Sequence, residues 1–341
     1  MSKQALALKY RPKTLSDVVE QSSVIKILQY MLDNKCWSNV MLFCGAAGCG
    51  KTTVARIMSY YINEGKGVPI EIDAASNNSV DGMRQIIEES KVKSIDSEYK
   101  VYILDEVHQF SNAAWQSFLK TCEEPPKRTI FILCTTDPQK IPNTIHSRVQ
   151  RFDFNRITYN GIFNRLKYIC DTETKEGNTI EYEDSALEYI AKLSEGGMRD
   201  AITNLDKALN YSRQLTVKNV IESLGLQDYD TFFELCKSTI KGDIKNIIDI
   251  IERTYLQGKD LKLFIEQYAD FLLDICKYEI VHDYTYIQIP QTYDNEIESL
   301  LHYVNYVNNM RREMVQLHFD IKYESLPKML IESKFFEMCN E

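Results

Sequence analysis

The chain has 341 residues, of which 44% are hydrophobic and 26% are charged, proportions that suit a globular protein of two or three domains. It holds no run of about 18 apolar residues, and Met1 to Pro12 lack the apolar core and cleavage site of a signal peptide. We therefore expect a cytoplasmic protein with no membrane partner. The nine cysteines are scattered, with no Cys-x-x-Cys pair and no His at metal-ligand spacing, which argues against a zinc site.

The net charge of −9 is unevenly distributed along the chain. Residues 227–300 hold 7 Lys and Arg against 15 Asp and Glu, a net charge of −8, and residues 301–341 have a net charge of −1. Residues 1–226 are therefore neutral overall. Because contacts to nucleic-acid phosphates require Lys and Arg, the acidic C-terminal third is disfavoured as a DNA-binding region.

Five short apolar runs in the first half of the chain predict buried parallel strands, because each is rich in β-branched or aromatic residues. These runs are Val40–Cys44, Pro69–Asp73, Val101–Asp105, Thr129–Thr135 and Val149–Phe154. Helical patterns lie between them at Thr52–Ile62, Val80–Ser90 and Asn112–Glu123. Repeated strand and helix units of this kind predict a doubly wound α/β domain with a five-stranded parallel sheet over residues 1–156.

The remainder of the chain is predicted to be helical. Amphipathic periods at Thr158–Cys170, Ser185–Leu193 and Met198–Tyr211, with no strand between them, predict a small helical domain over residues 157–226. Later periods predict an all-helical domain over residues 227–341, interrupted by a polar, Pro-containing stretch at Tyr284–Asp294. These periods are Asp230–Ile240, Asp243–Leu256, Lys259–Glu279, Asn295–Asn309 and Leu326–Cys339.

A glycine-rich loop follows the first predicted strand. Its sequence matches the pattern G-x-x-x-x-G-K-[ST], and a helical pattern begins directly after it. The glycines let backbone N–H groups point at phosphate oxygens, and the helix N-terminus adds its dipole. We expect Lys51 to reach the β- and γ-phosphates of ATP and the Thr52 hydroxyl to bind Mg²⁺. The predicted nucleotide-binding residues of this segment are Gly45, Ala46, Ala47, Gly48, Cys49, Gly50, Lys51, Thr52 and Thr53.

The third predicted strand ends in Asp105-Glu106. Because α/β ligand sites form at the carboxyl ends of parallel strands, this pair is expected beside the glycine-rich loop. Asp105 is predicted to hold Mg²⁺ through water, and Glu106 to orient and polarise the water that attacks the γ-phosphate. His108 is interpreted as a local hydrogen-bonding residue rather than a catalytic one. The sequence therefore predicts an ATP-hydrolysing site.

Four further segments carry a family resemblance: Ala7–Pro12 with Val18–Gln21, Thr135–Pro142, Ser147-Arg148 and Gly196–Asp200. They resemble the AAA+ ATPases of clamp loaders, in particular the gamma/tau subunits of the bacterial DNA polymerase III clamp loader. The resemblance is strong over residues 1–226, almost continuous from Asp105 to Phe154, and weak beyond residue 226. It implies an AAA+ fold with a helical lid domain, and the C-terminal helical domain is assigned to an oligomerisation collar by its position and helicity.

The resemblance implies a role for each segment. Thr136 would hydrogen-bond the γ-phosphate or the attacking water, and Arg199 would reach the same phosphate from the lid. Arg148 would act in trans, as an arginine finger in the site of the neighbouring subunit. The alternatives are that Arg148 is a solvated surface residue and that Arg199 forms an ion pair with Asp200 or Glu195, of which the second is disfavoured by the two preceding glycines. The residues that would enclose the adenine are Ala7, Tyr10, Arg11, Pro12, Val18 and Val19.

The sequence also departs from the family. Ile62–Val68 connects the loop helix directly to the second strand, where bacterial members carry a four-cysteine zinc module, so we expect no zinc. Glu20 stands where the family usually has Gly, and Val149 stands where it usually has Cys. The sequence given lacks the long C-terminal extension of the tau form, so no tethering to a helicase or polymerase is inferred from it.

The loop Ser76–Val80 is the segment most similar to the family's DNA-facing loop, which follows phosphates rather than reading bases. Asn78 and Arg84 are the candidate DNA contacts, although the loop lacks the basic residues that are often found there. Ser79 is interpreted as a helix cap.

Together these observations predict the ATPase motor subunit of a sliding clamp loader. The implied partners are other loader subunits and copies of itself in a ring-like, pentameric assembly, together with the sliding clamp and primer-template DNA. Two alternatives remain: another AAA+ DNA motor, such as a helicase loader or branch-migration ATPase, and a non-hydrolysing scaffold subunit of a clamp loader. The acidic helical C-terminal third argues against the first alternative, and intact Lys51, Thr52, Asp105 and Glu106 argue against the second.

Overall fold

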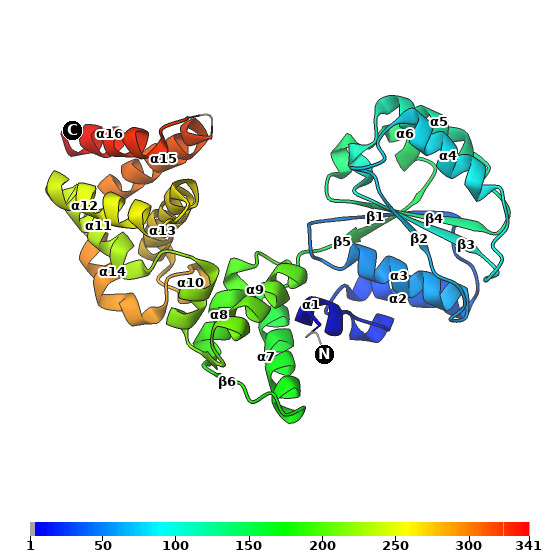
Figure 1. Cartoon of the computed structure of the whole chain (residues 1–341), viewed down its shortest axis with the longest axis horizontal. Helices are drawn as coiled ribbons and strands as arrows, with labels where there is room; N and C mark the ends of the chain where they lie inside the picture. The colour runs from blue at the N-terminus through cyan, green and yellow to red at the C-terminus, as the bar shows by residue number, and fades with distance from the viewer. Residues whose placement is uncertain (1–3, 323, 341) are drawn as a thin grey trace. The chain divides into compact units, whose positions relative to one another are not determined.

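The computed structural model describes residues 4–322 and 324–340 (Figure 1). The chain forms two compact units, of which the first comprises Met1–Thr172 and Ser194–Asp206 and the second comprises Glu173–Leu193 and Lys207–Glu341. Both units take part of the segment 157–226, so the division into three domains stays a prediction. No helix in the described part of the chain is long and apolar enough to span a bilayer.

The first unit contains a five-stranded, all-parallel sheet in the order β2-β3-β4-β1-β5. The predicted strands are confirmed, with ends that shift by no more than one residue. The expected burial holds for the inner strands but not for the two edge strands: β2 alternates between half-buried and exposed residues, and β5 has exposed Arg151 and Asp153 next to its buried residues. The strands are β1 (Val40–Gly45), β2 (Ile70–Asp73), β3 (Lys100–Asp105), β4 (Thr129–Thr135) and β5 (Gln150–Phe154).

Helices cover both faces of this sheet (Figure 1). Alternate side chains of each strand point to opposite faces, so Met41 and Phe43 pack into one core with α2 and α3, while Leu42 packs into a second core with α4 and α5. Trp115 and Phe118 of α5 are fully buried in the second core. The helices are α2 (Ser22–Asp33), α3 (Lys51–Ile62), α4 (Val80–Ser90), α5 (Asn112–Glu123) and α6 (Asn143–His146).

Helix α2 was not among the predicted elements. Its buried residues Val24, Leu28 and Met31 are spaced for one helical face. Its start is poorly marked, because Gln21 makes no capping side-chain bond and the first turn holds no acidic residue. Before it lie the short helix α1 (Leu6–Lys9) and a 3₁₀ turn, η1 (Leu15–Asp17), and after the sheet come α7 (Tyr159–Lys175) and α9 (Met198–Tyr211).

The predicted helices after the sheet are confirmed, but the expectation of no strand between them is wrong. β6 (Glu181–Tyr182) lies between α7 and α8 (Asp184–Leu193) in sequence, and it pairs in parallel with β7 (Gln214–Leu215). Each of these strands has two residues, which is too short for the alternating pattern that identifies a strand. The next helix, α10 (Val217–Leu224), packs against α8 in the second unit.

The rest of the second unit is helical, as predicted, but its fourth predicted helix, Asn295–Asn309, is two helices. The chain leaves the helix at His302-Tyr303, and the second helix extends to Ile321. Both helices pack against α13. The elements are α11 (Tyr229–Lys241), α12 (Ile244–Leu256), α13 (Leu261–Val281), η4 (Tyr284–Tyr286), η5 (Gln291–Tyr293), α14 (Asp294–Leu301), α15 (Val304–Ile321) and α16 (Pro327–Asn340).

Candidate nucleotide-binding site

The glycine-rich loop connects β1 to α3, as the sequence predicts. Gly45 and Gly48 have φ angles of 153° and 70°, which favour glycine. A Cβ atom on Gly45 would lie 2.4 Å from the backbone oxygen of Phe154, and one on Gly48 would lie 3.1 Å from the Cα atom of Gly197. The loop is therefore closely packed on both sides, and it leaves the first N–H groups of α3 available to bind an anion.

Lys51 is the first residue of α3, and only 6% of it is exposed. Its ammonium donates hydrogen bonds to the carbonyl oxygens of Gly45 and Ala46, both at 2.8 Å. The charge is thus held inside the loop by two neutral acceptors. A phosphate oxygen is a stronger acceptor for an ammonium than a carbonyl, so this position suits a phosphate-binding lysine.

The Thr52 hydroxyl donates to Oδ2 of Asp105 at 2.8 Å, which joins the start of α3 to the end of β3. Within residues 4–322 and 324–340, no group of three or more His, Cys, Asp and Glu side chains has the arrangement of a metal site. Mg²⁺ does not need such a group, because it is usually held by one or two carboxylates together with substrate phosphates and water. A hydroxyl and a carboxylate at this distance fit that donor set.

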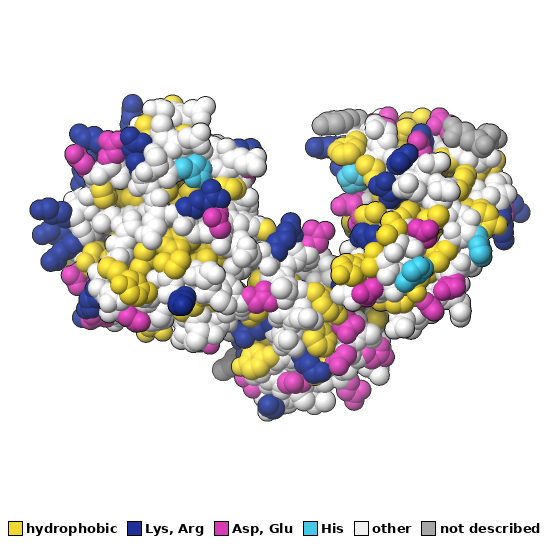
Figure 2. All heavy atoms as spheres, turned by 180° about the vertical axis from the view of Figure 1, so that it is seen from behind, with side chains coloured by type: hydrophobic (Ala, Val, Ile, Leu, Met, Phe, Trp, Pro, Cys, Tyr) yellow, Lys and Arg dark blue, Asp and Glu magenta, His cyan; other side chains and the backbone are white. Residues whose placement is uncertain are grey.

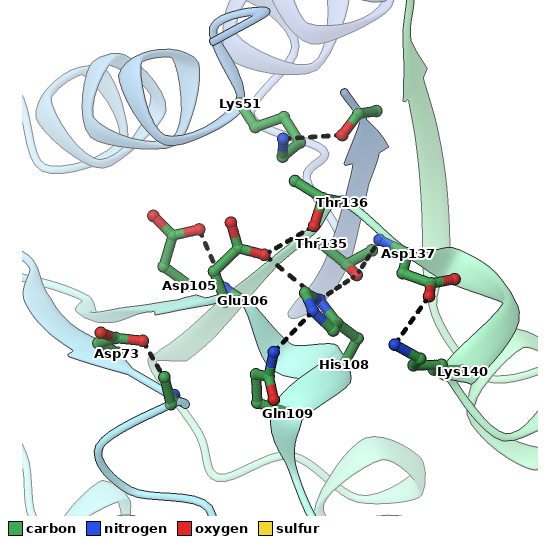
Figure 3. A network of polar contacts seen from close by, with 12 residues as sticks. Lys51, Asp73, Asp105, Glu106, His108, Gln109, Thr135, Thr136, Asp137 and Lys140 are labelled. Carbon is green, nitrogen blue, oxygen red and sulfur yellow. Dashed lines mark hydrogen bonds and ion pairs between the residues drawn. The ribbon is translucent and has the colours of Figure 1, made fainter. Parts of the chain in front are cut away.

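Glu106 follows the last residue of β3, and its backbone has a φ angle of 50°. A left-handed conformation is uncommon for a non-glycine residue and is often found at functional sites. Oε2 of Glu106 accepts a hydrogen bond from the hydroxyl of Thr136 at 3.0 Å. Figure 3 shows Asp105, Glu106 and Thr136 together at the carboxyl ends of β3 and β4.

His108 lies closer to the predicted catalytic residue than the sequence indicated. Its Nδ1 atom is 3.3 Å from Oε2 of Glu106 and 3.2 Å from the hydroxyl oxygen of Thr135 (Figure 3). Its side chain is 10% exposed, and Nε2 lies 3.0 Å from Nε2 of Gln109. The interpretation as a hydrogen-bonding residue is confirmed, but one of its partners is the predicted catalytic carboxylate. The 3₁₀ turn η2 (Val107–Gln109) brings it back toward Glu106.

A cavity of about 420 Å³ adjoins the loop in the first unit. The N-terminal segment, the loop, the start of α3 and parts of α7 and α9 line it. Of the predicted nucleotide-binding residues, those that line this cavity are Ala7, Tyr10, Arg11, Pro12, Val18, Val19, Gly48, Cys49, Gly50, Lys51, Thr52, Thr53 and Arg199. Burial raises the pKa of the Cys49 thiol, so this side chain stays protonated at neutral pH.

Several residues of the cavity wall were not predicted. Arg165 of α7 donates from Nη2 to the backbone oxygen of Tyr10 at 2.9 Å, which connects α7 to the N-terminal segment. No motif marks this arginine, because its role depends on a neighbour that is distant in sequence. The other unpredicted residues are Ala5, Leu8, Ile157, Met198, Ile202 and Thr203. Gly45, Ala46 and Ala47 belong to the loop but do not line the cavity.

Arg199 lines the cavity from the first turn of α9. The segment before it is bonded to the glycine-rich loop, since the backbone N–H of Met198 donates to the oxygen of Gly48 at 3.1 Å. Among the described residues, Arg199 forms no ion pair with Asp200 or Glu195, and Arg156 pairs with Glu195 at 3.6 Å. The position of Arg199 therefore suits a contact to a ligand in the cavity.

Arg148 lies apart from this cavity and is paired within its own chain. Its Nε atom donates to Oε1 of Glu123 at 2.6 Å, and Nη1 donates to the backbone oxygen of Thr144 at 2.7 Å. The Arg148 side chain is 35% exposed, so it is neither fully solvated nor buried. Its predicted action in a neighbouring subunit stays a prediction.

The candidate DNA residues lie at the start of α4. The hydroxyl of Ser79 accepts from the backbone N–H of Gly82 at 3.1 Å, so the interpretation of Ser79 as a helix cap is confirmed. Asn78 is exposed, and Arg84 lies 3.4 Å from the carboxylate of Asp81. On the face drawn in Figure 2, Lys and Arg side chains are interspersed with Asp and Glu side chains. DNA contacts at Asn78 and Arg84 stay a prediction.

The connection from α3 to β2 spans residues 63–69 and contains no cysteine. Three family models match successive parts of the chain. "DNA polymerase III, delta subunit" matches residues 68–158, "DNA polymerase III clamp loader subunit, ATPase lid domain" matches residues 161–214, and "DNA polymerase III subunits gamma and tau domain III" matches residues 215–308. The last match corrects the expectation that the resemblance is weak beyond residue 226.

Full-length comparisons point to the same family. The chain is 34% identical to the DNA polymerase III subunit tau of Bacillus subtilis strain 168, over 99% of this chain and 64% of that protein. It is 30% identical to the DNA polymerase III subunit gamma of Buchnera aphidicola subsp. Acyrthosiphon pisum, over 94% of this chain and 92% of that protein. The chain thus spans nearly all of this gamma subunit but less than two thirds of the longer tau protein.

A solved structure with the same fold is the Thermotoga maritima RuvB Holliday junction branch migration motor. The match has a TM-score of 0.51 and 19% identity, and it covers 74% of this chain and 86% of that chain. At this identity the similarity shows the fold alone, which is the predicted AAA+ sheet with following helical domains. With the matched domain models and the near-complete gamma relative, the chain belongs to the gamma/tau family of DNA polymerase III clamp-loader subunits.

Proposed function

We propose that this chain is the ATP-hydrolysing motor subunit of a sliding clamp loader. ATP binding closes a ring-like, pentameric assembly that opens the clamp and holds primer-template DNA, and hydrolysis releases both. The observation that carries this proposal is that Lys51, Thr52, Asp105 and Glu106 lie around one end of the sheet, because phosphoryl transfer uses a lysine, a hydroxyl and carboxylates gathered in this way around the phosphates.

The roles of the residues follow from this arrangement. Lys51 binds the β- and γ-phosphates, while the loop N–H groups bind phosphate oxygens. Thr52 and Asp105 hold Mg²⁺, which neutralises charge on the phosphates when it is bound. Glu106 accepts a hydrogen bond from the attacking water and orients it, and Thr136 donates its hydroxyl to the γ-phosphate or to that water. Arg199 contacts the γ-phosphate from α9.

The adenine is proposed to lie against the N-terminal segment. Tyr10 is buried, and Val18 and Val19 line the same cavity, so they provide an apolar surface for a ring. The proposed partners are other loader subunits and further copies of this chain, the sliding clamp, and primer-template DNA. The relatives named DNA polymerase III subunits tau and gamma, and the match to a clamp loader lid domain, support this set of partners.

An ATPase assay tests the proposal. Turnover is measured with Mg²⁺ and ATP for the assembled loader, alone and with the cognate clamp, primed DNA, or both. We expect primed DNA and clamp together to raise turnover at least several-fold. The Lys51→Ala chain in the same assembly gives the background, because it lacks the phosphate-binding ammonium. Turnover that is unaffected by clamp and primed DNA would contradict a clamp-loading function.

The same assay separates the two alternatives. A branch-migration motor with this fold would be stimulated by branched duplex DNA and not by a clamp. A scaffold subunit would give no turnover above the Lys51→Ala background. The match of residues 215–308 to gamma and tau domain III argues against the branch-migration alternative. The presence of Lys51, Thr52, Asp105 and Glu106, with the Thr52 hydroxyl donating to Asp105 at 2.8 Å, argues against the scaffold alternative.

A further inference from the structure

Glu20 and Gln21 adopt an unusual backbone conformation directly after the cavity residues Val18 and Val19. Their φ angles are 58° and 57°, so two successive non-glycine residues lie in the left-handed region. A conformation of this kind costs free energy at each residue and persists only when surrounding contacts fix it. The backbone oxygen of Gln21 accepts from the N–H of Ile25 in α2 at 2.9 Å, and the side-chain hydrogen bonds of Glu20 and Gln21 go to the connection between β5 and α7, residues 155–158.

Gln21 binds the backbone of Asn155 at both ends of its amide. Its Nε2 atom donates to the oxygen of Asn155 at 2.7 Å, and its Oε1 atom accepts from the N–H of Asn155 at 3.0 Å. Only 6% of Gln21 is exposed, so water does not compete freely for these bonds. These two hydrogen bonds fix the position of the residue after β5 relative to the N-terminal segment.

Glu20 binds the start of α7. Oε2 accepts from the backbone N–H of Thr158 at 2.9 Å, and Oε1 accepts from the hydroxyl of the same residue. A carboxylate at this end of a 17-residue helix also interacts favourably with the helix dipole. Gly161 leaves room for it, because a Cβ atom there would lie 2.6 Å from Oε1 of Glu20.

These contacts join two walls of one cavity. Val18 and Val19 form part of its N-terminal wall, and Ile157, between the two residues that Gln21 and Glu20 bind, lines it as well. A ligand that displaces Val18 or Val19 therefore moves the connection that carries Ile157 and the first turn of α7. Resting on the proposed function, we infer that Glu20 and Gln21 are positioning residues, which transmit the binding of an adenine nucleotide to α7.

Glu20→Gly is the informative substitution. Glycine adopts a φ angle of 58° without strain, so this change removes the carboxylate and leaves a backbone that still favours the native conformation. Glu64→Gly is a matched control, because Glu64 has a φ angle of 52° and lies in the connection between α3 and β2, paired with Lys35 at 3.2 Å. Glu20→Gln keeps an oxygen that accepts from the Thr158 N–H, so it should restore the behaviour of the unaltered chain.

The test is hydrogen–deuterium exchange of the full chain with and without ATPγS and Mg²⁺, combined with the dissociation constant of ATPγS. In the unaltered chain and in Glu64→Gly, nucleotide should slow exchange both in the loop, residues 45–55, and in residues 155–165. In Glu20→Gly the slowing should persist in the loop and be lost in residues 155–165, and ATPγS should bind about fivefold more weakly. A purely structural role for Glu20 would change both segments together.

Two results would overturn the inference. The first is that nucleotide slows hydrogen–deuterium exchange in residues 155–165 of the Glu20→Gly chain as much as in the unaltered chain. The second is an unaltered chain in which only the loop responds to nucleotide, which leaves the proposed function intact. If nucleotide slows neither segment of the unaltered chain, the proposed ATPase function fails together with the inference.

Discussion

The hydroxyl of Thr136 donates a hydrogen bond to Oε2 of Glu106 at 3.0 Å. This bond joins the residue predicted to contact the γ-phosphate, Thr136, to the residue predicted to orient the attacking water, Glu106. A hydroxyl has one hydrogen to donate. When that hydrogen is donated to a phosphate or to the attacking water, Glu106 loses this bond and its carboxylate can accept from water instead. We therefore expect the two predicted roles to be coupled, because the Thr136 hydroxyl must leave Glu106 before it can donate to the phosphate or to the water.

Thr136→Val tests this relationship, because valine keeps the shape of threonine and removes the hydroxyl. We expect turnover of the assembled loader to fall at least about tenfold while ATP affinity changes little, since the lost bond is needed after binding. Thr203→Val is the control, because Thr203 is a threonine of the cavity wall whose hydroxyl donates to the backbone oxygen of Arg199 and not to Glu106. If ATP affinity falls as much as turnover, Thr136 contributes to ATP binding and not to the hydrolysis step.

Lys51→Ala and Glu106→Gln should separate binding from turnover. Without the ammonium of Lys51, we expect nucleotide binding to be abolished. Glutamine at position 106 keeps the size of the side chain but is a poor base, so ATP binding and clamp engagement should persist while turnover falls about a hundredfold or more. Titration with labelled ATP and a single-turnover assay measure the two quantities. Equal loss of ATP binding in both variants would refute these roles.

His108 should affect turnover through Glu106. Its Nδ1 atom lies 3.3 Å from Oε2 of the carboxylate, so His108→Ala removes a neighbour that restricts where Glu106 points. We expect a fall in kcat of about tenfold with little change in KM, and partial recovery in His108→Asn, whose amide nitrogen can replace Nδ1. If alanine and asparagine are equally impaired, the polar contact between Nδ1 and the Glu106 carboxylate is not what His108 contributes.

The sequence predicted the sheet, the loop and the acidic pair because each is encoded locally. Apolar runs mark the strands, and the glycines and Lys51 occupy fixed positions between β1 and α3. Contacts between segments that are distant in the sequence have no such local pattern. The bonds from Glu20 and Gln21 to residues 155–158 join segments more than a hundred residues apart, and their chemistry is that of ordinary polar side chains. The strands β6 and β7 were not predicted, because two residues are too few to show the alternation of apolar and polar residues that identifies a strand.

The break between α14 and α15 shows a second limit. Ile297 and Leu300 of α14 and Val307 and Met310 of α15 are all buried, so the apolar spacing continues through the break as it would in one helix. Neither proline nor glycine marks the end, because the chain leaves the helix at His302 and Tyr303. Both helices pack against α13, a contact between segments that the local sequence pattern does not reveal.

The proposed magnesium site can be tested by removing the metal or its ligands. In the unaltered chain, chelation with EDTA should abolish turnover and weaken ATP binding, because Thr52 and Asp105 then have no cation to hold at the phosphates. Thr52→Val and Asp105→Asn should require higher Mg²⁺ concentrations for the same turnover. Thr53→Val is the matched control, because Thr53 lines the cavity and is predicted to contact the nucleotide but not Mg²⁺. Equal Mg²⁺ requirements in Thr52→Val and Thr53→Val would exclude Thr52 as a ligand.

Arg148 and Glu123 form an ion pair at 2.6 Å, which gives the predicted arginine finger a partner within its own chain. If Arg148 acts in the site of a neighbouring subunit, Arg148→Ala should bind ATP normally and hydrolyse it about a hundredfold or more slowly, but only in the assembly. Glu123→Gln should weaken the competing pair and leave Arg148 freer to reach the neighbour, so its turnover should equal or exceed that of the unaltered loader. Both variants are compared as isolated subunits and as assembled loaders. An Arg148→Ala subunit that is as impaired alone as in the complex would show that Arg148 does not act in trans, because an isolated subunit has no neighbour to receive it.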